Sequence, residues 1–263
     1  MRLTPLAALA ALCLSPIAAS AADAAPKTEI TWYGHSAFTV TTPGGTVFAI
    51  DPFFGNPKSP DPKAGETLPR VDYVLVTHGH FDHVGDAVAI GKRTGAKLVS
   101  NFDLCQALVA AGYPEGQASM ATCGNIGGAL QLGDATVIMV PAVHSSGLDV
   151  GKVGGTAMGF IIKVKGGPTV YHTGDTDVFN DMALIRQFHK VDVMLACIGG
   201  HFTMGPERAA IAVKLVNPDL VIPMHFGTFP VLSGTPQALE SALKAEGSKA
   251  RVKTMSVGET IKL

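Results

Sequence analysis

The chain has 263 residues, of which 47% are hydrophobic and 16% are charged, and its formal net charge is −1. This composition excludes a disordered chain, and without any block of like charges the sequence offers no footprint for nucleic acid. The length suits one large or two small globular domains with a sizeable core.

The first 21 residues have the organisation of an export signal. Arg2 supplies a positive charge, residues 6–14 are apolar but too few to span a bilayer, and Ala19-Ser20-Ala21 forms a small-residue cleavage site. We predict that residues 1–21 are a signal peptide and that the mature protein is periplasmic or secreted. No membrane contact is expected after its removal.

Three cysteines follow the predicted cleavage site, namely Cys105, Cys123 and Cys197. None belongs to a C-x-x-C pair, so a cysteine zinc site is not expected. An oxidising compartment would allow a bridge between Cys105 and Cys123, which the sequence leaves open. Cys197 lies in an apolar run and is expected to pack in the core.

Strands precede helices in the first half of the chain. We predict strands at 29–33, 37–42, 46–50, 71–76 and 96–100, and helices at 86–93 and 103–111, the second capped by Asp103. The proline-rich segment 51–69 between them is typical of a structureless lid or binding loop.

The second half follows the same logic. We predict strands at 129–132, 136–140, 156–164, 169–172, 192–198 and 220–224, helices at 181–189, 206–217 and 236–246, and two terminal strands. A glycine-rich loop is expected at 145–155. The two similar halves indicate two sheets face to face with helices outside, within one domain of residues 22–263.

The segment 77–83, which reads Thr-His-Gly-His-Phe-Asp-His, concentrates three of the nine histidines in six residues. It follows an apolar run that predicts a buried strand, so the histidines are expected at the carboxyl end of that strand. The spacing lets His78 and His80 point at one ion, while Asp82 and His83 point at a second.

Three further metal-binding candidates follow predicted strands. These are His144, Asp175 and His225, each at or just beyond a strand end. One such histidine is commonly structural, but three groups in this position, together with the cluster, favour a metal site.

The pattern H-x-H-x-D-H, followed by an isolated His, Asp and His, resembles the metallo-β-lactamase superfamily. The segments 32–36, 199–204 and 224–227 resemble a narrower branch of metal-dependent hydrolases related to L-ascorbate-6-phosphate lactonase. The resemblance implies an α+β fold, the four-layer αβ/βα sandwich. It also implies that His78, His80 and His144 hold one ion, that Asp82, His83 and His225 hold the other, and that Asp175 bridges them.

Imidazole and carboxylate ligands suit two divalent ions, with zinc preferred and manganese or iron possible. Such a pair of ions activates water for attack on an ester, lactone or related bond of a small-molecule substrate. Asp82 is expected to orient the nucleophile. His35 and His201 are catalytic candidates that either contact the substrate or form hydrogen bonds behind the ligands.

Two other functions remain open at this point. One is a redox enzyme of the same fold, such as an iron-dependent persulfide dioxygenase, and the other is a metal-binding protein without turnover. The sequence reveals neither the substrate nor whether the chain forms a homo-oligomer.

Overall fold

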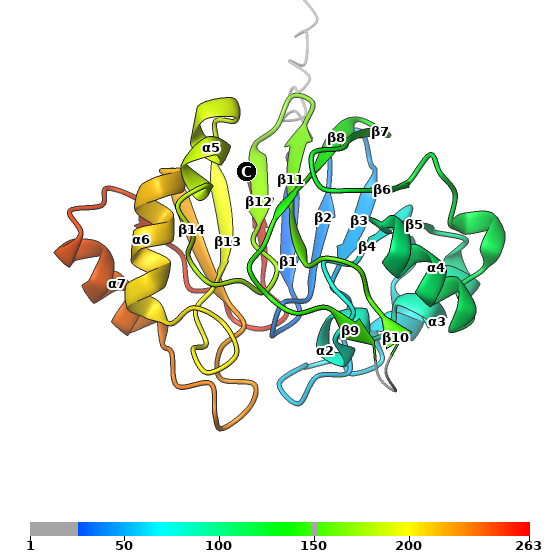
Figure 1. Ribbon diagram of the computed structural model, residues 1–263, viewed down its shortest axis with the longest axis horizontal. Coiled ribbons are helices and arrows are strands. Elements are labelled where there is room, and N and C mark those ends of the chain that lie inside the picture. The colour runs from blue at the N-terminus through cyan, green and yellow to red at the C-terminus, as the bar shows by residue number, and fades with distance from the viewer. Residues whose placement is uncertain (1–25, 149–151) are drawn as a thin grey trace, which may run out of the picture.

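Two seven-stranded sheets lie face to face in the computed structural model, which describes residues 26–148 and 152–263 (Figure 1). The predicted signal peptide lies outside the described residues. In sheet order, the first sheet contains β16 (Thr260–Lys262), β1 (Glu29–Trp32), β2 (Phe38–Thr41), β3 (Val47–Ile50), β4 (Tyr73–Leu75), β5 (Lys97–Asn101) and β6 (Cys123–Gly124). The second contains β15 (Arg251–Val252), β14 (Leu220–Met224), β13 (Val193–Cys197), β12 (Thr169–His172), β11 (Met158–Val164), β8 (Ala135–Pro141) and β7 (Ala129–Leu132). A separate hairpin joins β9 (Gly147–Leu148) to β10 (Lys152–Val153).

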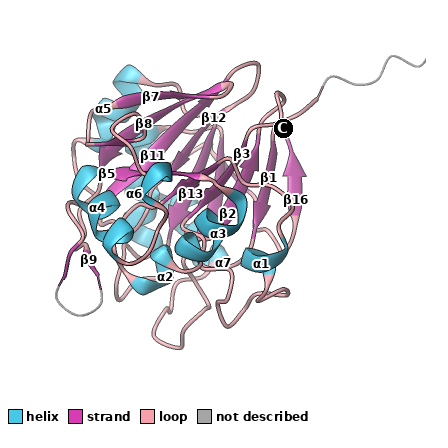
Figure 2. Cartoon of the chain, turned by 90° about the vertical axis from the view of Figure 1, so that its right-hand side faces the viewer, coloured by secondary structure: helices cyan, strands magenta, loops and turns pink. Residues whose placement is uncertain are grey.

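Helices cover the outer face of each sheet (Figure 1, Figure 2). The helices of the described residues are α1 (Ala64–Thr67), α2 (Phe81–Val84), α3 (Ala87–Thr94), α4 (Phe102–Ala110), α5 (Met182–Phe188), α6 (Pro206–Val216) and α7 (Pro236–Ala245), with a 3-10 turn at Glu115–Gln117. On the first sheet α3 contacts β4 and α4 contacts β5, whereas on the second α6 contacts β13, α5 and α7. The order of layers is helix, sheet, sheet, helix, which confirms the predicted αβ/βα sandwich.

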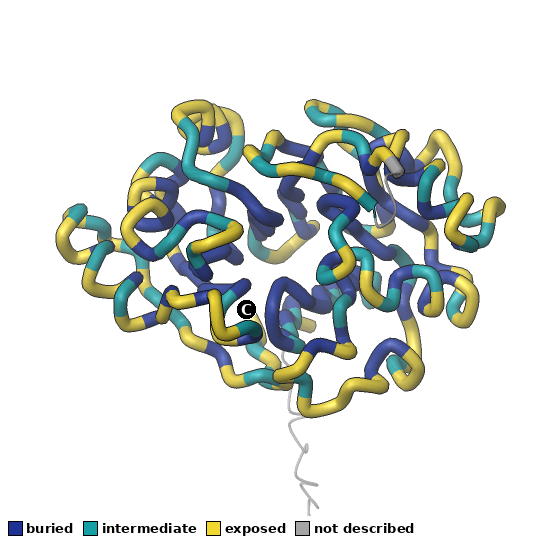
Figure 3. The backbone as a smooth tube through the Cα atoms, turned by 60° about the horizontal axis from the view of Figure 1, so that its bottom comes forward, coloured by how far each residue is buried: buried dark blue, intermediate teal, exposed yellow. Residues whose placement is uncertain are grey.

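The alternation of side chains along β4 shows why the layers form. Leu75 packs into the core between the sheets, whereas Val74 joins the core beneath α3 and α4, because successive side chains of a strand point to opposite faces. Both side chains are fully buried, and each contributes about 1.5–3 kcal/mol by leaving water. In Figure 3 the buried residues follow the central strands, and the exposed residues lie on the outer helices and loops.

Parallel strands in both sheets position the site. β3, β4 and β5 are parallel neighbours in the first sheet, as are β12, β13 and β14 in the second. The carboxyl ends of parallel strands share one edge of a sheet, so the loops that follow these strands gather there. This edge is the lower one in Figure 1, where α2 lies.

Several local predictions needed correction. Asn101, rather than Asp103, caps α4, because its side chain accepts a hydrogen bond from the Leu104 N–H. The short helices α1 and α2 form within segments predicted to be loops, and β9 and β10 form within the predicted glycine-rich loop. The two terminal strands pair with different sheets, β15 with β14 and β16 with β1.

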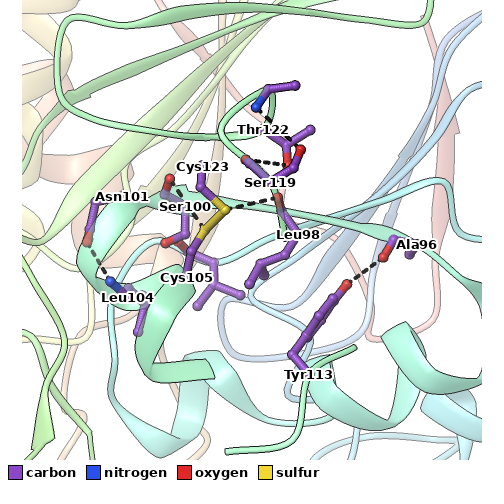
Figure 4. The surroundings of a disulfide bond; sticks show 12 residues. Ala96, Leu98, Ser100, Asn101, Leu104, Cys105, Tyr113, Ser119, Thr122 and Cys123 are labelled. Atoms are coloured by element: carbon purple, nitrogen blue, oxygen red, sulfur yellow. Dashed lines mark hydrogen bonds between the residues drawn. A yellow bond between two sulfur atoms is a disulfide. The ribbon is translucent and has the colours of Figure 1, made fainter. Parts of the chain in front are cut away.

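The bridge between Cys105 and Cys123 is present in the structure, where it ties α4 to β6 (Figure 4). The two Cα atoms lie 6.1 Å apart, and the cysteines are separated by 18 positions. Cys197 is free and buried, as predicted. Within the described ranges, no helix combines the length and apolarity that crossing a bilayer requires.

We expect the double substitution Cys105→Ser and Cys123→Ser to lower the free energy of unfolding by about 3 kcal/mol, because a bridge of this span restricts the unfolded chain. Denaturant titration with and without reductant measures the effect. Cys197→Ala is the control. This variant keeps the Cys105–Cys123 bridge, so reductant should shift its unfolding midpoint as much as it shifts that of the wild type. Peptide mapping that finds both bridging cysteines as free thiols would contradict the prediction.

Candidate metal centre

The loops at one edge of the two sheets bring all seven predicted ligands together. The first sheet supplies His78, His80, Asp82 and His83 after β4, and the second supplies His144 after β8, Asp175 after β12 and His225 directly after β14. Residues far apart in the sequence therefore converge between the two sheets.

Three imidazoles form the first ligand set. The Nε2 atom of His78 lies 2.9 Å from Nδ1 of His80, and Nε2 of His144 lies 3.3 Å from the same atom. These three nitrogens all lie within 4.8 Å of one another. Separations of this size are those of donors that share one ion at about 2.0–2.1 Å.

The second set combines carboxylate and imidazole. The Oδ2 atom of Asp82 lies 3.9 Å from Nε2 of His83 and 3.8 Å from Nε2 of His225. His35 offers a further nitrogen within 4.8 Å of the other three donors. The sequence did not predict that His35 lies so close to this set.

Asp175 lies between the two sets. Its Oδ2 atom is 3.0 Å from His225 Nε2 and 3.3 Å from His83 Nε2, and it is 3.6 Å from His144 Nε2 and 4.0 Å from His78 Nε2. One carboxylate oxygen therefore approaches histidines of both sets, as the bridging position requires.

Several buried atoms of the cluster lack a hydrogen-bond partner in the protein. His83 Nε2, His225 Nε2 and Asp175 Oδ1 are buried and make no hydrogen bond. Buried polar atoms without partners are costly, and a metal ion would satisfy them. Because the donors are nitrogen and carboxylate oxygen, the cluster fits divalent transition metals.

A buried carboxylate beneath the cluster fixes which ring nitrogens face it. Asp51 accepts hydrogen bonds from the Thr77 hydroxyl (2.7 Å) and from Nδ1 of His83 (2.7 Å). Because the Thr77 proton goes to Asp51, the hydroxyl accepts the Nδ1–H of His78 (3.0 Å). In the neutral form, each of these histidines would therefore carry its proton on Nδ1 and leave Nε2 free to bind a metal ion.

Burial and neighbouring charges oppose each other in the metal-free cluster. Burial favours the neutral form of His225, but Asp175 outweighs it and raises the pKa of that imidazole to about 9. Burial would raise the pKa of Asp175, yet His225 and His83 hold it well below its usual range. The carboxylates of Asp82 and Asp175 thus favour positive charge in a buried space, as expected for a cation-binding site.

Unusual backbone conformations gather at this site. In the described part of the chain, five non-glycine residues have left-handed backbone, and three of them are His35 (φ 53°), Asp51 (φ 43°) and His225 (φ 55°). Such conformations cost about 1–3 kcal/mol each and persist where the surroundings enforce them. Here the backbone N–H of His225 donates to the carbonyl of His35, which ties the second sheet to the first.

His35 forms a hydrogen bond with Asp82. Its ring is fully buried, and its Nε2 lies 2.9 Å from Oδ2 of Asp82 while its Nδ1 lies 3.0 Å from the Thr228 hydroxyl. Burial lowers the pKa of His35 to about 4, although the hydrogen bond to Asp82 works against this shift. A neutral ring that donates to Asp82 therefore accepts from Thr228.

The other histidines lie away from the ligand sets. His201 is exposed, and its ring packs against Phe202 with a centroid distance of 4.4 Å. His172 is buried and donates from Nε2 to the Ser36 carbonyl, while its Nδ1 accepts from the Gly174 N–H. His189 follows α5, where its ring lies near that of Phe188.

Sequence reasoning missed Asp51 and Thr228. Asp51 had a usable signal, because it follows a predicted strand directly, as the predicted ligands do. Thr228 had none, because its contact with His35 depends on how the two sheets meet.

A cavity of about 360 Å³ opens onto the metal cluster. Its lining residues are His80, Phe81, Asp82, His144, Ser145, Asp175 and Phe202. Four of these are predicted ligands, so a small molecule in the cavity would lie directly against the metal centre.

Comparison with known proteins supports a metal centre at these residues. The β-lactamase superfamily domain matches residues 29–225, which include every predicted ligand. A metal-dependent hydrolase of the UPF0173 family from Anaeromyxobacter sp. (strain K) is 63% identical over 240 residues, covering 89% of this chain and 86% of that protein. The chain belongs to the UPF0173 family of metal-dependent hydrolases. It is therefore a metal-dependent hydrolase of the metallo-β-lactamase superfamily.

Solved structures of similar proteins place the UPF0173 chain in the same fold. Igni18, a metallo hydrolase from the archaeon Ignicoccus hospitalis, is 37% identical, with a TM-score of 0.79 over 90% of this chain and 98% of that one. The metallo-β-lactamase fold protein YhfI from Bacillus subtilis is 14% identical, with a TM-score of 0.67 over 90% of this chain and 100% of that one. The second likeness extends to the fold alone.

Proposed function

We propose that this UPF0173 hydrolase is a binuclear enzyme that cleaves an ester, lactone or related bond with activated water. The position of Asp175 carries the proposal, because its Oδ2 atom approaches His78 and His144 of one ligand set and His83 and His225 of the other. In this assignment Asp175 would be the ligand shared by two ions. Zinc is the preferred metal, and manganese or iron would suit the same donors.

Bound ions of this kind supply an activated solvent nucleophile and stabilise negative charge on the substrate oxygen. The chain's own residues then set the geometry. Asp82 is the carboxylate of the cluster with the greater exposure, at 15% against 3% for Asp175, so it faces the cavity and can orient the attacking water. His35 and Thr228 keep Asp82 in place, which makes His35 a positioning residue in this proposal.

The substrate bond is inferred from the branch resemblance. The segments 32–36, 199–204 and 224–227 resemble hydrolases related to L-ascorbate-6-phosphate lactonase, which supports a cyclic or linear ester as the reacting group. His201 stays a catalytic candidate only if the exposed loop that carries it closes toward the cavity.

The reaction is tested by a single turnover of metal-loaded enzyme in labelled water. Oxygen from the solvent should enter the acid product, and no covalent enzyme intermediate should accumulate, because solvent is the nucleophile. Trapping an acyl-enzyme would overturn the proposal. Oxygen consumption with a persulfide substrate would instead assign the protein to the redox enzymes of this fold.

We also propose that the protein is exported. The n-region, apolar segment and cleavage site of residues 1–21 support this, and so does the Cys105–Cys123 bridge, since disulfides persist in oxidising compartments. The intact mass of protein recovered from the periplasm should correspond to a chain that begins at Ala22. A full-length product confined to the cytoplasm would refute export.

A further inference from the structure

The cavity at the metal cluster has an apolar lining beyond the predicted ligands. The remaining lining residues are Phe81, Ser145 and Phe202. Among the described residues that line it, none is a lysine or arginine. The polar exception is Ser145, whose hydroxyl lies 3.3 Å from Nε2 of His80.

The two phenylalanines are unusually open to solvent. Phe81 is 56% exposed and Phe202 is 55% exposed, although large aromatic side chains stabilise the fold most when they are buried. They come from different sheets, because Phe81 begins α2 after β4 and Phe202 follows β13. The two rings therefore flank the cavity from opposite halves of the sandwich.

Phe81 packs against other aromatic rings beside the cavity. Its ring meets the ring of Phe53 edge to face at 5.9 Å and lies 6.5 Å from the ring of Phe229. Phe53 and Phe229 also pack against His35, at 6.1 and 5.6 Å. These contacts form an aromatic surface beside the predicted metal ligands, and this surface is preformed in the absence of substrate.

The charges nearby do not favour an anionic group away from the reacting bond. Lys58 lines a different cavity, which shares no lining residue with the metal cavity. Arg208 is exposed and paired with Asp177. The charged side chains of the lining other than histidine are Asp82 and Asp175, both predicted metal ligands, so the lining offers no cationic side chain that would bind a carboxylate or phosphate away from the metal centre.

We propose that the substrate is an uncharged ester or lactone with an aromatic or alkyl group beside the reacting bond, and that this group packs against Phe81 and Phe202. The inference rests on the proposed hydrolytic function and narrows its substrate. It also separates this enzyme from one that would select a phosphorylated lactone.

The first test compares 4-nitrophenyl acetate, butyrate and hexanoate with mono-4-nitrophenyl adipate, which carries the hexanoate chain length with a terminal carboxylate. We expect kcat/KM to rise about fourfold for each added methylene, the factor that corresponds to about 0.8 kcal/mol. The adipate should react at least about tenfold more slowly than the hexanoate. An adipate that reacts as fast as the hexanoate would overturn the proposal.

The second test uses variants. Phe202→Ala should flatten the dependence on chain length while retaining the wild-type metal content, because Phe202 is not a predicted ligand. Phe102→Ala is the matched control, since Phe102 is also exposed, at 44%, but does not line the metal cavity. An unchanged chain-length dependence in Phe202→Ala would contradict the assigned subsite.

A binding measurement separates this inference from the proposed function. The ¹⁹F resonance of 4-fluorobenzyl alcohol should broaden with metal-loaded wild type and with Phe102→Ala, and much less with Phe202→Ala. Broadening that depends on Phe202, without hydrolysis of any ester, would support the subsite and refute hydrolysis. Hydrolysis without chain-length preference and without such broadening would support hydrolysis and refute the subsite.

Discussion

Replacement of Asp82 with asparagine is expected to lower kcat by about a thousandfold, within the range that positioned acid–base groups contribute. The substitution keeps the shape of the side chain but removes one of the two carboxylates in the cluster. It therefore weakens the attraction for the second ion and leaves the attacking water without a negatively charged acceptor. The hydrogen bond that Asp82 receives from His35 (2.9 Å) survives in one orientation of the amide.

Steady-state kinetics must be combined with elemental analysis, because loss of metal and loss of orientation both lower kcat. Excess metal should restore occupancy in Asp82→Asn without restoring the rate. His35→Gln should lower kcat with less metal loss, since His35 acts through Asp82 in this account. Wild-type kcat in the metal-saturated Asp82→Asn variant would contradict the role assigned to Asp82.

The second large effect is expected at Asp51, which lies beneath the cluster and is fully buried. Its carboxylate accepts from the Thr77 N–H, from the Thr77 hydroxyl and from His83 Nδ1. In the Asp51→Asn variant, the side-chain NH2 group would face one of these donors, and that hydrogen bond would be lost. We expect metal affinity to fall by about 10–100-fold, as for other groups that orient ligating histidines, and the fold to lose about 1–3 kcal/mol.

Asp134→Asn is the matched control for Asp51→Asn. Asp134 also accepts from a threonine hydroxyl and a backbone N–H, those of Thr42 and Gly44, but it lies on a surface turn away from the cluster. Metal titration and denaturant unfolding of both variants measure the two effects. Equal metal affinity in Asp51→Asn and Asp134→Asn would show that Asp51 does not orient the ligands.

The predicted ligands could be found from the sequence because their signal is local. His78, Asp175 and His225 each follow an apolar run that reads as a buried strand, and strand ends meet where parallel strands share an edge. The αβ/βα sandwich followed from the same alternation of strands and helices together with the family resemblance.

The supporting contacts could not be found in this way because they depend on pairing between distant segments. Asp51 reaches Thr77 because β3 and β4 are parallel neighbours, with Ile50 opposite Leu75. The pairing of β16 with β1 likewise joins two segments that lie about as far apart in the sequence as the described strands allow. The cap of α4 was mistaken because Asn101 and Asp103 are both suitable capping residues, and the choice depends on where β5 ends.

The most direct measurement is the metal content of the purified protein and three histidine variants, by elemental analysis after removal of loosely bound ions. We expect nearly two ions per chain in the wild type, with losses in His144→Ala and His225→Ala, which remove one donor from each ligand set. His189→Ala should keep the wild-type content, because His189 follows α5, outside both ligand sets. Equal metal content in all three variants, or a wild type that never binds more than one ion, would contradict the binuclear site.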